Sequence, residues 1–187
     1  MPQSSGIHNR ELLDVLQAVE PRPLNGPVWR ATWATRDPLI GGTLGGRWHP
    51  PESFEALYTS QEADGALAEM YFHLSRAPVF ASSSLRLFRL RIETRKTLWL
   101  TEMKALIRLG IDEGGYASLD HGRCREIGAA AHFLEFDSLL VPSARWPCLN
   151  LILLLDRLNT QAALAVEQAS DINWPAWREQ RQGRRKP

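Results

Sequence analysis

The apolar positions of the first fifty residues form one helical and one strand-like pattern. Leucines and valines recur at helical spacing between residues 8 and 20, which predicts an N-terminal helix. The segment 24–27 is typical of a turn, and alternation from Val28 to Trp33 predicts a strand. Residues 34–52 are rich in Gly and Pro and predict a loop; a loop of this length in a compact chain is usually functional or disordered.

The rest of the chain mixes helical and strand-like patterns without a regular order. Strands are predicted over residues 54–60, 85–92, 97–100, 138–141, 149–155 and 162–168. Helices are predicted over 62–75 and 123–134, with a helical patch ending at Leu109 and a short helix over 175–180. Because strands and helices do not alternate regularly, the expected fold class is α+β rather than a doubly wound sheet. No linker or internal repeat divides the chain, so we expect a single domain over residues 1–187.

Composition and charge exclude several classes of protein. The 187 residues carry a formal net charge of +1, so no overall field attracts nucleic acid, and the basic tail at 178–187 is expected to be solvated. No apolar run is long enough to span a membrane and the N-terminus has no signal pattern, which together favour a cytoplasmic protein. Two cysteines are too few for a disulfide framework, and no metal-ligand spacing occurs among the five histidines.

The common nucleotide and hydrolase motifs are incomplete. Gly41 and Gly46 have the spacing of a phosphate-binding P-loop, but Arg47 and Trp48 follow where that motif requires Lys and then Ser or Thr. No GxGxxG sequence follows a predicted strand, which excludes a Rossmann NAD site. Ser143 lies in Val-Pro-Ser-Ala-Arg, which is not the GxSxG nucleophile elbow, so a hydrolase using Ser143 is a remote alternative.

Three short segments nevertheless carry candidate binding chemistry. Arg47 follows two glycines, so its planar guanidinium lies beside backbone that a pyrophosphate can approach. Glu69 offers a carboxylate at the flank of the predicted helix 62–75, and Ser143 offers a hydroxyl at a strand end. A cation, a carboxylate and a hydroxyl in one cleft suit an anionic, sugar-bearing ligand such as a dinucleotide. Taken singly, these residues fit ordinary structural roles more readily, and the same holds for Arg30, Trp48 and Tyr58.

Together the residues resemble the RES domain, a family named for its Arg, Glu and Ser. The matching strings keep the family's order and spacing between about residues 27 and 157: Val28–Arg30, Gly45–His49, Ala56–Ser60, Ala66–Glu69, Arg123–Ala131 and Leu139–Arg145. His49 departs from the family, which often has Asn at that position.

The resemblance implies the toxin of a bacterial toxin–antitoxin pair. The implied fold is similar to that of ADP-ribosyltransferases, with split mixed sheets and flanking helices that hold NAD+ in a cleft. NAD+ enters as substrate and no metal is expected. The implied partner is an antitoxin, usually a small helical DNA-binding protein, that covers the cleft. The acceptor of the ADP-ribose stays open between a protein side chain and a small molecule such as phosphate or water.

Cleavage of the nicotinamide–ribose bond assigns a role to each candidate residue. Loss of nicotinamide leaves an oxocarbenium-like ribose that a fixed carboxylate stabilises, and Glu69 is the candidate for that carboxylate. The other candidates are expected to bind the substrate: Arg47 and Arg30 at its phosphates or ribose, Tyr58 and Trp48 beside its rings, and Ser143 at the nicotinamide or behind Glu69. The competing interpretation is a non-catalytic nucleotide-binding module whose basic tail contacts DNA or protein.

Overall fold

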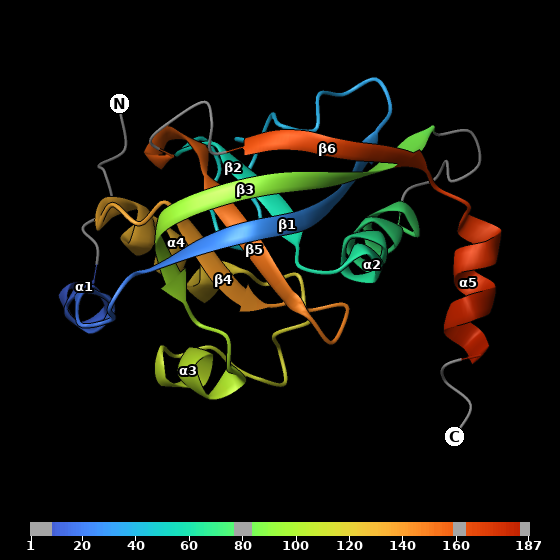
Figure 1. The fold of residues 1–187 in the computed structure, drawn as a ribbon. Coiled ribbons are helices and arrows are strands. Elements are labelled where there is room, and N and C mark those ends of the chain that lie inside the picture. The colour runs from blue at the N-terminus through green and yellow to red at the C-terminus, as the bar shows by residue number, and fades with distance from the viewer. Residues whose placement is uncertain (1–8, 77–83, 159–163, 184–187) are drawn as a thin grey trace.

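In a computed structural model, the chain forms a mixed sheet flanked by helices (Figure 1). The structure describes residues 9–76, 84–158 and 164–183. The first element is helix α1 (Arg10–Gln17), where the Asn9 side chain accepts a hydrogen bond from the Leu12 N–H at 3.3 Å. The helix ends at Gln17, earlier than the predicted residue 20, and the strand that follows begins at Arg22. Residue 8, the predicted helix start, lies outside the described residues.

Six strands divide into two antiparallel groups of three. One group is β1 (Arg22–Trp33), β3 (Leu85–Trp99) and β6 (Leu164–Asp171), and the other is β2 (Ala56–Ser60), β5 (Leu149–Leu154) and β4 (Ser138–Pro142). The groups meet at the antiparallel pair Trp29–Ser60 and at three parallel pairs between β3 and β4. Figure 1 shows the strands of one group crossing those of the other steeply. This arrangement confirms the predicted α+β class with split mixed sheets.

The core explains why several strands lack polar alternation. On β5, Ile152 and Leu154 face a cluster shared with α1 and α4, whereas Leu151 and Leu153 face the cluster between the two strand groups. A strand buried on both faces needs apolar side chains at every position. The continuous apolar run 149–155 therefore predicted a strand correctly even though it has no period of two.

Over the described ranges, five α-helices cover the ends and one face of the sheet. Helix α2 (Ala63–Leu74) follows β2, and α3 (Met103–Arg108) and α4 (Gly122–Phe133) lie between β3 and β4; α5 (Trp174–Gly183) follows β6, and a 3-10 turn, η1 (Leu155–Arg157), follows β5. Figure 1 shows α1 and α4 at one end of the molecule and α2 and α5 at the other. No helix among the described residues is both long and apolar enough to cross a bilayer.

Two predictions about the first strand group are wrong. The predicted turn at 24–27 is part of β1, where Pro27 pairs with Arg91 of β3. A proline is tolerated more easily there because, among the described residues, this half of β1 pairs with β3 alone and its other edge carries no strand. The two predicted strands 85–92 and 97–100 are one continuous strand, β3.

Buried hydroxyls keep β3 extended through the polar segment 93–96. Thr97 Oγ1 lies 2.6 Å from Thr94 Oγ1 and 2.8 Å from Ser138 Oγ, and Ser138 in turn donates to Asp137 Oδ1 at 2.9 Å. Asp137 also accepts hydrogen bonds from two backbone N–H groups of the polar segment. With these buried groups satisfied, β3 continues from the first strand group into its parallel pairing with β4.

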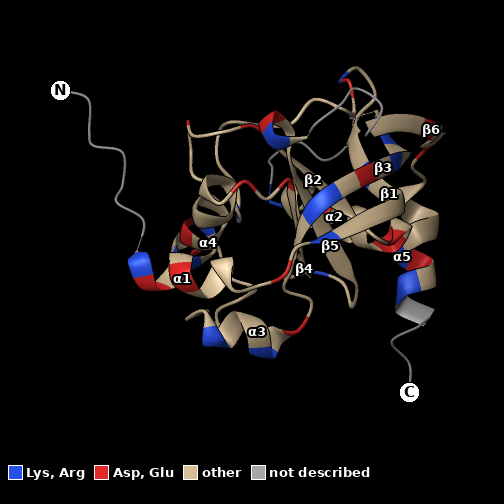
Figure 2. Cartoon of the chain, turned by 60° about the vertical axis from the view of Figure 1, so that its left-hand side comes forward, with Lys and Arg blue, Asp and Glu red and all other residues tan. Residues whose placement is uncertain are grey.

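Charge is mixed over the described surface. Figure 2 shows basic and acidic positions interspersed on β3, α1 and α5, in keeping with the formal net charge of +1. The predicted basic tail is described only as far as Gly183, so Arg184, Arg185 and Lys186 lie outside the described residues.

Candidate active site

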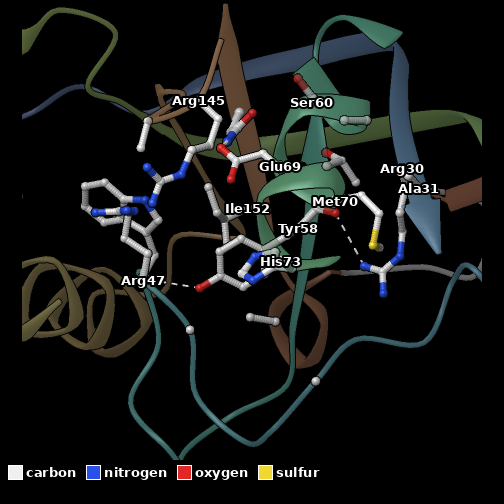
Figure 3. A pocket seen from close by; sticks show the side chains of 18 of the residues that line it. Arg30, Ala31, Arg47, Tyr58, Ser60, Glu69, Met70, His73, Arg145 and Ile152 are labelled. Carbon is white, nitrogen blue, oxygen red and sulfur yellow. Dashed lines mark hydrogen bonds between the residues drawn. The ribbon is translucent and has the colours of Figure 1, made fainter. Parts of the chain in front are cut away.

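A cavity of about 510 Å³ opens where β1 and β2 diverge (Figure 3). Its walls come from β1, the loop that precedes β2, β2 itself, α2, β5, the end of β4 with the turn after it, and α4 with the loop before it. Five of the six sequence-predicted site residues line it: Arg30, Arg47, Trp48, Tyr58 and Glu69. The sixth, Ser143, lies behind the wall in contact with Glu69. Segments far apart in sequence are thus brought together as the motif analysis expected.

The Gly45–Trp48 loop is fixed by close backbone packing. A Cβ at Gly46 would lie 2.4 Å from the Tyr58 hydroxyl, and one at Gly128 would lie 1.6 Å from the Trp48 carbonyl oxygen. Only glycine permits these two approaches, which explains Gly128 at the start of the small-residue run in α4. The Arg125 guanidinium also donates from Nε to the Gly46 carbonyl at 2.9 Å. Helix α4 therefore sets the position of Arg47.

Arg47 is held by backbone carbonyls. Its guanidinium donates to the Tyr116 carbonyl and, at 3.2 Å, to the Ser118 carbonyl. It also lies over the Tyr116 ring, with 5.0 Å between Cζ and the ring centroid. The Tyr116 hydroxyl donates to the Pro142 carbonyl at 2.6 Å, which ties this loop to the end of β4. Arg47 is oriented without losing its charge to a carboxylate.

Glu69 is fixed by two donors to one carboxylate oxygen. Its Oε1 accepts from Ser143 Oγ at 2.8 Å and from Asn150 Nδ2 at 2.9 Å. Ser143 Oγ also accepts from the Arg145 backbone N–H at 3.1 Å. Of the two roles predicted for Ser143, these contacts favour bracing Glu69. Asn150 was not predicted as a site residue; its signal in the sequence is an amide that interrupts the apolar run 149–155.

The Tyr58 hydroxyl is held by the Arg47 loop and the Trp48 side chain is buried, so neither ring simply forms an exposed flat surface in the cavity. The Tyr58 hydroxyl accepts from the Trp48 backbone N–H at 2.9 Å and lies 2.9 Å from His49 Nδ1. Burial raises the pKa of Tyr58 well above its usual range, so the phenol stays neutral. The Trp48 indole is 2% exposed and packs in the core. Its predicted contact with a ligand stays a prediction, since so little of the side chain is accessible.

The cavity carries a large excess of positive charge. Among the described residues that line it, Glu69 is the one carboxylate, facing five guanidinium groups: Arg30, Arg36, Arg47, Arg125 and Arg145. Burial, and then the charge of Arg36, lowers the pKa of Arg30 to about 10. His73 and His121 also line the cavity, and burial and neighbouring arginines lower the pKa of each. Such a cavity attracts polyanions.

Arg36, His73 and His121 were not predicted as site residues, and they lie outside the strings that match the family. Arg125 and Arg145 lie within two of those strings, but no role was predicted for either. No three side chains of metal-binding type come together within the described part of the chain.

Comparison with known proteins identifies the family. The RES domain model matches residues 27–179, beyond the predicted limit of 157 and into α5. The protein named NAD(+) phosphorylase MbcT of Mycobacterium tuberculosis (strain H37Rv) is 32% identical over 123 residues, which are 62% of this chain and 66% of that protein. A second protein of that strain, named as a probable NAD(+) phosphorylase, is 29% identical over 143 residues, 73% of this chain and 68% of its own.

A solved structure extends the likeness to the fold. A chain in the crystal structure of the M. tuberculosis MbcT–MbcA toxin–antitoxin complex matches with a TM-score of 0.83 and 25% identity, covering 94% of this chain and 100% of that chain. The curated relatives are spanned over only about two thirds of their length. Since the family model spans β1 to α5, including the whole cavity, the chain belongs to the RES domain family.

Proposed function

We propose that the chain is an NAD+ phosphorylase, the toxin of a toxin–antitoxin pair. Relatives carrying that activity in their names, and a matching chain from a toxin–antitoxin complex, support this function. The observation that carries it is a single fixed carboxylate, Glu69, in a cavity whose other charged side chains, among the described residues, are all arginines. The arginines bind the phosphates of the substrate, and the carboxylate stabilises the ribose, which becomes positively charged during the reaction.

The reaction begins with the departure of nicotinamide. The bond from ribose C1′ to the pyridinium nitrogen breaks, and its electron pair leaves with a neutral nicotinamide. No proton is required, so a general acid is unnecessary. Positive charge develops on C1′ and the ring oxygen, and Glu69, held by Ser143 and Asn150, lies ready to stabilise it. Because both donors are already in place, the carboxylate does not reorganise as the charge forms.

The remaining site residues bind and orient. Arg47 holds the pyrophosphate through the N–H groups that its two carbonyl contacts leave free. Tyr58 lies against the ribose or nicotinamide with its hydroxyl fixed by the Arg47 loop. A cationic cavity favours an anionic acceptor over water, which makes inorganic phosphate the acceptor and ADP-ribose 1″-phosphate the product. Transfer to a protein side chain is the alternative outcome.

The partner is an antitoxin that covers the cavity, and we expect it to be a small helical DNA-binding protein. The cytoplasm is the expected location, because NAD+ and phosphate are both available there. If the antitoxin covers the cavity, its coexpression is expected to abolish NAD+ consumption by this chain in cells.

Glu69→Gln tests the proposal. The purified variant keeps the side-chain shape and loses the charge, so kcat for NAD+ consumption falls by roughly 10²–10³-fold. The NAD+ KM stays nearly constant, because the lost interaction forms only in the transition state. Nicotinamide and ADP-ribose 1″-phosphate are quantified by liquid chromatography and mass spectrometry. Glu167→Gln, an exposed glutamate of β6 paired with Arg89, is the matched control.

Wild-type turnover by Glu69→Gln would overturn the assignment of the carboxylate. A wild-type protein that binds NAD+ without consuming it would instead favour the non-catalytic binding module. Labelled NAD+ incubated with lysate distinguishes the acceptors, since transfer leaves a labelled protein band and phosphorolysis leaves a labelled small molecule.

A further inference from the structure

The cationic groups of the cavity fall into two sets on opposite sides of Glu69. Figure 3 shows Arg47 and Arg145 on one side of the Glu69 carboxylate and Arg30 on the other. The charges of Arg47 and Arg145, together with that of Arg125, act on the same group, the His121 imidazole. The charge that acts on Arg30 is that of Arg36. The first set is called the three-arginine group and the second the Arg30–Arg36 pair.

The Arg30–Arg36 pair has no anionic partner of its own. Arg30 donates to the Tyr58 carbonyl at 3.4 Å and to the Ile40 carbonyl at 3.2 Å, and Arg36 donates to the Gly41 carbonyl at 2.6 Å. Neither forms an ion pair with a carboxylate among the residues that the structure describes. The Arg30 Nε–H is buried with no acceptor in that same set of residues. Two guanidiniums beside each other, one with a buried unused donor, are costly unless an anion joins them.

The two sets suit different anions. The three-arginine group lies in the part of the cavity that Gly45 and Gly46 also line, and three guanidiniums suit the two adjoining phosphates of a dinucleotide. The Arg30–Arg36 pair offers two planar guanidiniums, which suits one tetrahedral anion. A phosphorolysis needs both kinds of site at once, because the pyrophosphate of the substrate and the attacking phosphate must flank the same ribose.

We propose that Arg30 and Arg36 form the subsite for the inorganic phosphate that attacks the ribose. The inference rests on the proposed phosphorylase function and deepens it. It adds Arg36, which has no part in the NAD+ site as described above, and it separates the role of Arg30 from that of Arg47. The pair holds the phosphate on the side of Glu69 away from the three-arginine group.

The step balances without a further reactant. An oxygen of HPO₄²⁻ forms a bond to ribose C1′ as the bond from C1′ to the nicotinamide nitrogen breaks, and that bonding pair leaves on nicotinamide. The products are neutral nicotinamide and a sugar phosphate monoester that still carries the phosphate proton. That proton then exchanges with water. The guanidiniums of the pair hold the other phosphate oxygens and lower the repulsion between the attacking anion and the pyrophosphate.

Arg36→Gln tests the subsite by separating two Michaelis constants. Loss of one charge-assisted contact raises the KM for phosphate roughly 10- to 100-fold, and the KM for NAD+ stays within about threefold because the three-arginine group is intact. Arg36→Lys keeps the charge without the planar fork and has an intermediate phosphate KM. Arg145→Gln shows the reverse pattern, with the larger change in the KM for NAD+. Arg91→Gln, at an exposed position of β3 outside the cavity, is the matched control and changes neither constant.

The outcomes are distinguishable. If Arg36→Gln raises the NAD+ KM and leaves that for phosphate unchanged, the pair belongs to the dinucleotide site and the inference is wrong. It is equally wrong if a folded Arg36→Gln, with the wild-type melting temperature, changes neither constant. If the wild-type protein itself consumes no NAD+ in the presence of phosphate, the proposed function fails first and the subsite with it.

Discussion

Substitution of Gly128 by alanine tests whether α4 positions the Arg47 loop. The added Cβ would lie 1.6 Å from the Trp48 carbonyl oxygen, whereas real Cβ contacts are essentially never under 3.0 Å. Helix and loop must therefore separate by at least about 1.4 Å, the difference between these two distances. Neither element moves easily, because Ile127 and the Trp48 indole are both buried in the same core cluster.

The expected loss of stability follows from this overlap. Overpacking in a dense core costs about 1–3 kcal/mol, and a clash with backbone belongs at the upper end. A loss of about 3 kcal/mol lowers the Tm of a chain of this size by roughly 6–12 °C. The same movement displaces Arg47 by about 1 Å, and a displacement of that size costs up to about 100-fold in kcat/KM.

Two measurements on variants of α4 test whether the helix positions the Arg47 loop. Thermal unfolding gives the Tm, and NAD+ consumption gives kcat/KM. Gly122→Ala is the matched control, since its Cβ would meet nothing closer than the Asp120 side chain at 3.5 Å. Gly122 begins α4, so alanine there is neutral or stabilises the fold by up to about 1 kcal/mol. A Gly128→Ala protein with the wild-type Tm and kcat/KM would refute the coupling of helix and loop.

Two further predictions concern the carboxylate and the histidines of the cavity. Asn150→Ala removes one of the two donors to Glu69 and lowers kcat roughly tenfold. When Ser143→Ala is added, the fold-loss in kcat differs from the product of the two single losses. Independent effects in this double-mutant cycle would contradict a shared role of the two donors. Lowering the pH from about 7.5 to 5.5 lowers the Tm. The pKa of His73 and of His121 is lower in the folded state than the ordinary histidine pKa of about 6.5, so below that pH the unfolded chain binds more protons than the folded one. The double variant His73→Gln, His121→Gln flattens this dependence in a fluorimetric scan, and an unchanged slope would show that other groups cause it.

The sequence predicted the elements whose side-chain pattern is complete within one segment. Helices α2 and α4 and strands β2, β4 and β5 lie close to their predicted ranges, because each carries its buried face in its own residues. The continuity of β3 could not be predicted in this way. Its polar segment 93–96 stays extended through hydrogen bonds from two of its backbone N–H groups to Asp137 and through the bond between the next residue, Thr97, and Ser138, all with partners more than forty positions away in the chain.

The same limit applies to the site. Arg47, Tyr58 and Glu69 were found because they stand in short motifs with a fixed spacing, and all three line the cavity. Asn150 was missed because its partner Glu69 is 81 residues away, and nothing in the strand's own pattern indicates a contact of its amide. The indole of Trp48 shows a second limit, since position in a motif does not tell how much of a side chain is accessible to a ligand; Trp48 lines the cavity but is only 2% exposed, and its contact with a ligand stays a prediction.

Among the described residues, backbone carbonyls and not carboxylates orient the guanidiniums of the cavity, and this affects how much of their charge is available to a ligand. A carboxylate partner would fix an arginine and also neutralise it, whereas a carbonyl fixes it and leaves the full charge available. The acceptors are the carbonyls of Ile40, Gly41, Gly46, Tyr58, Tyr116 and Ser118, which hold Arg30, Arg36, Arg47 and Arg125. The mutual repulsion of these cations is thus retained in the free protein and relieved when phosphates enter. Anion binding should therefore raise the Tm. The positive potential that attracts an anionic substrate is also the charge excess that the proposed antitoxin has to meet.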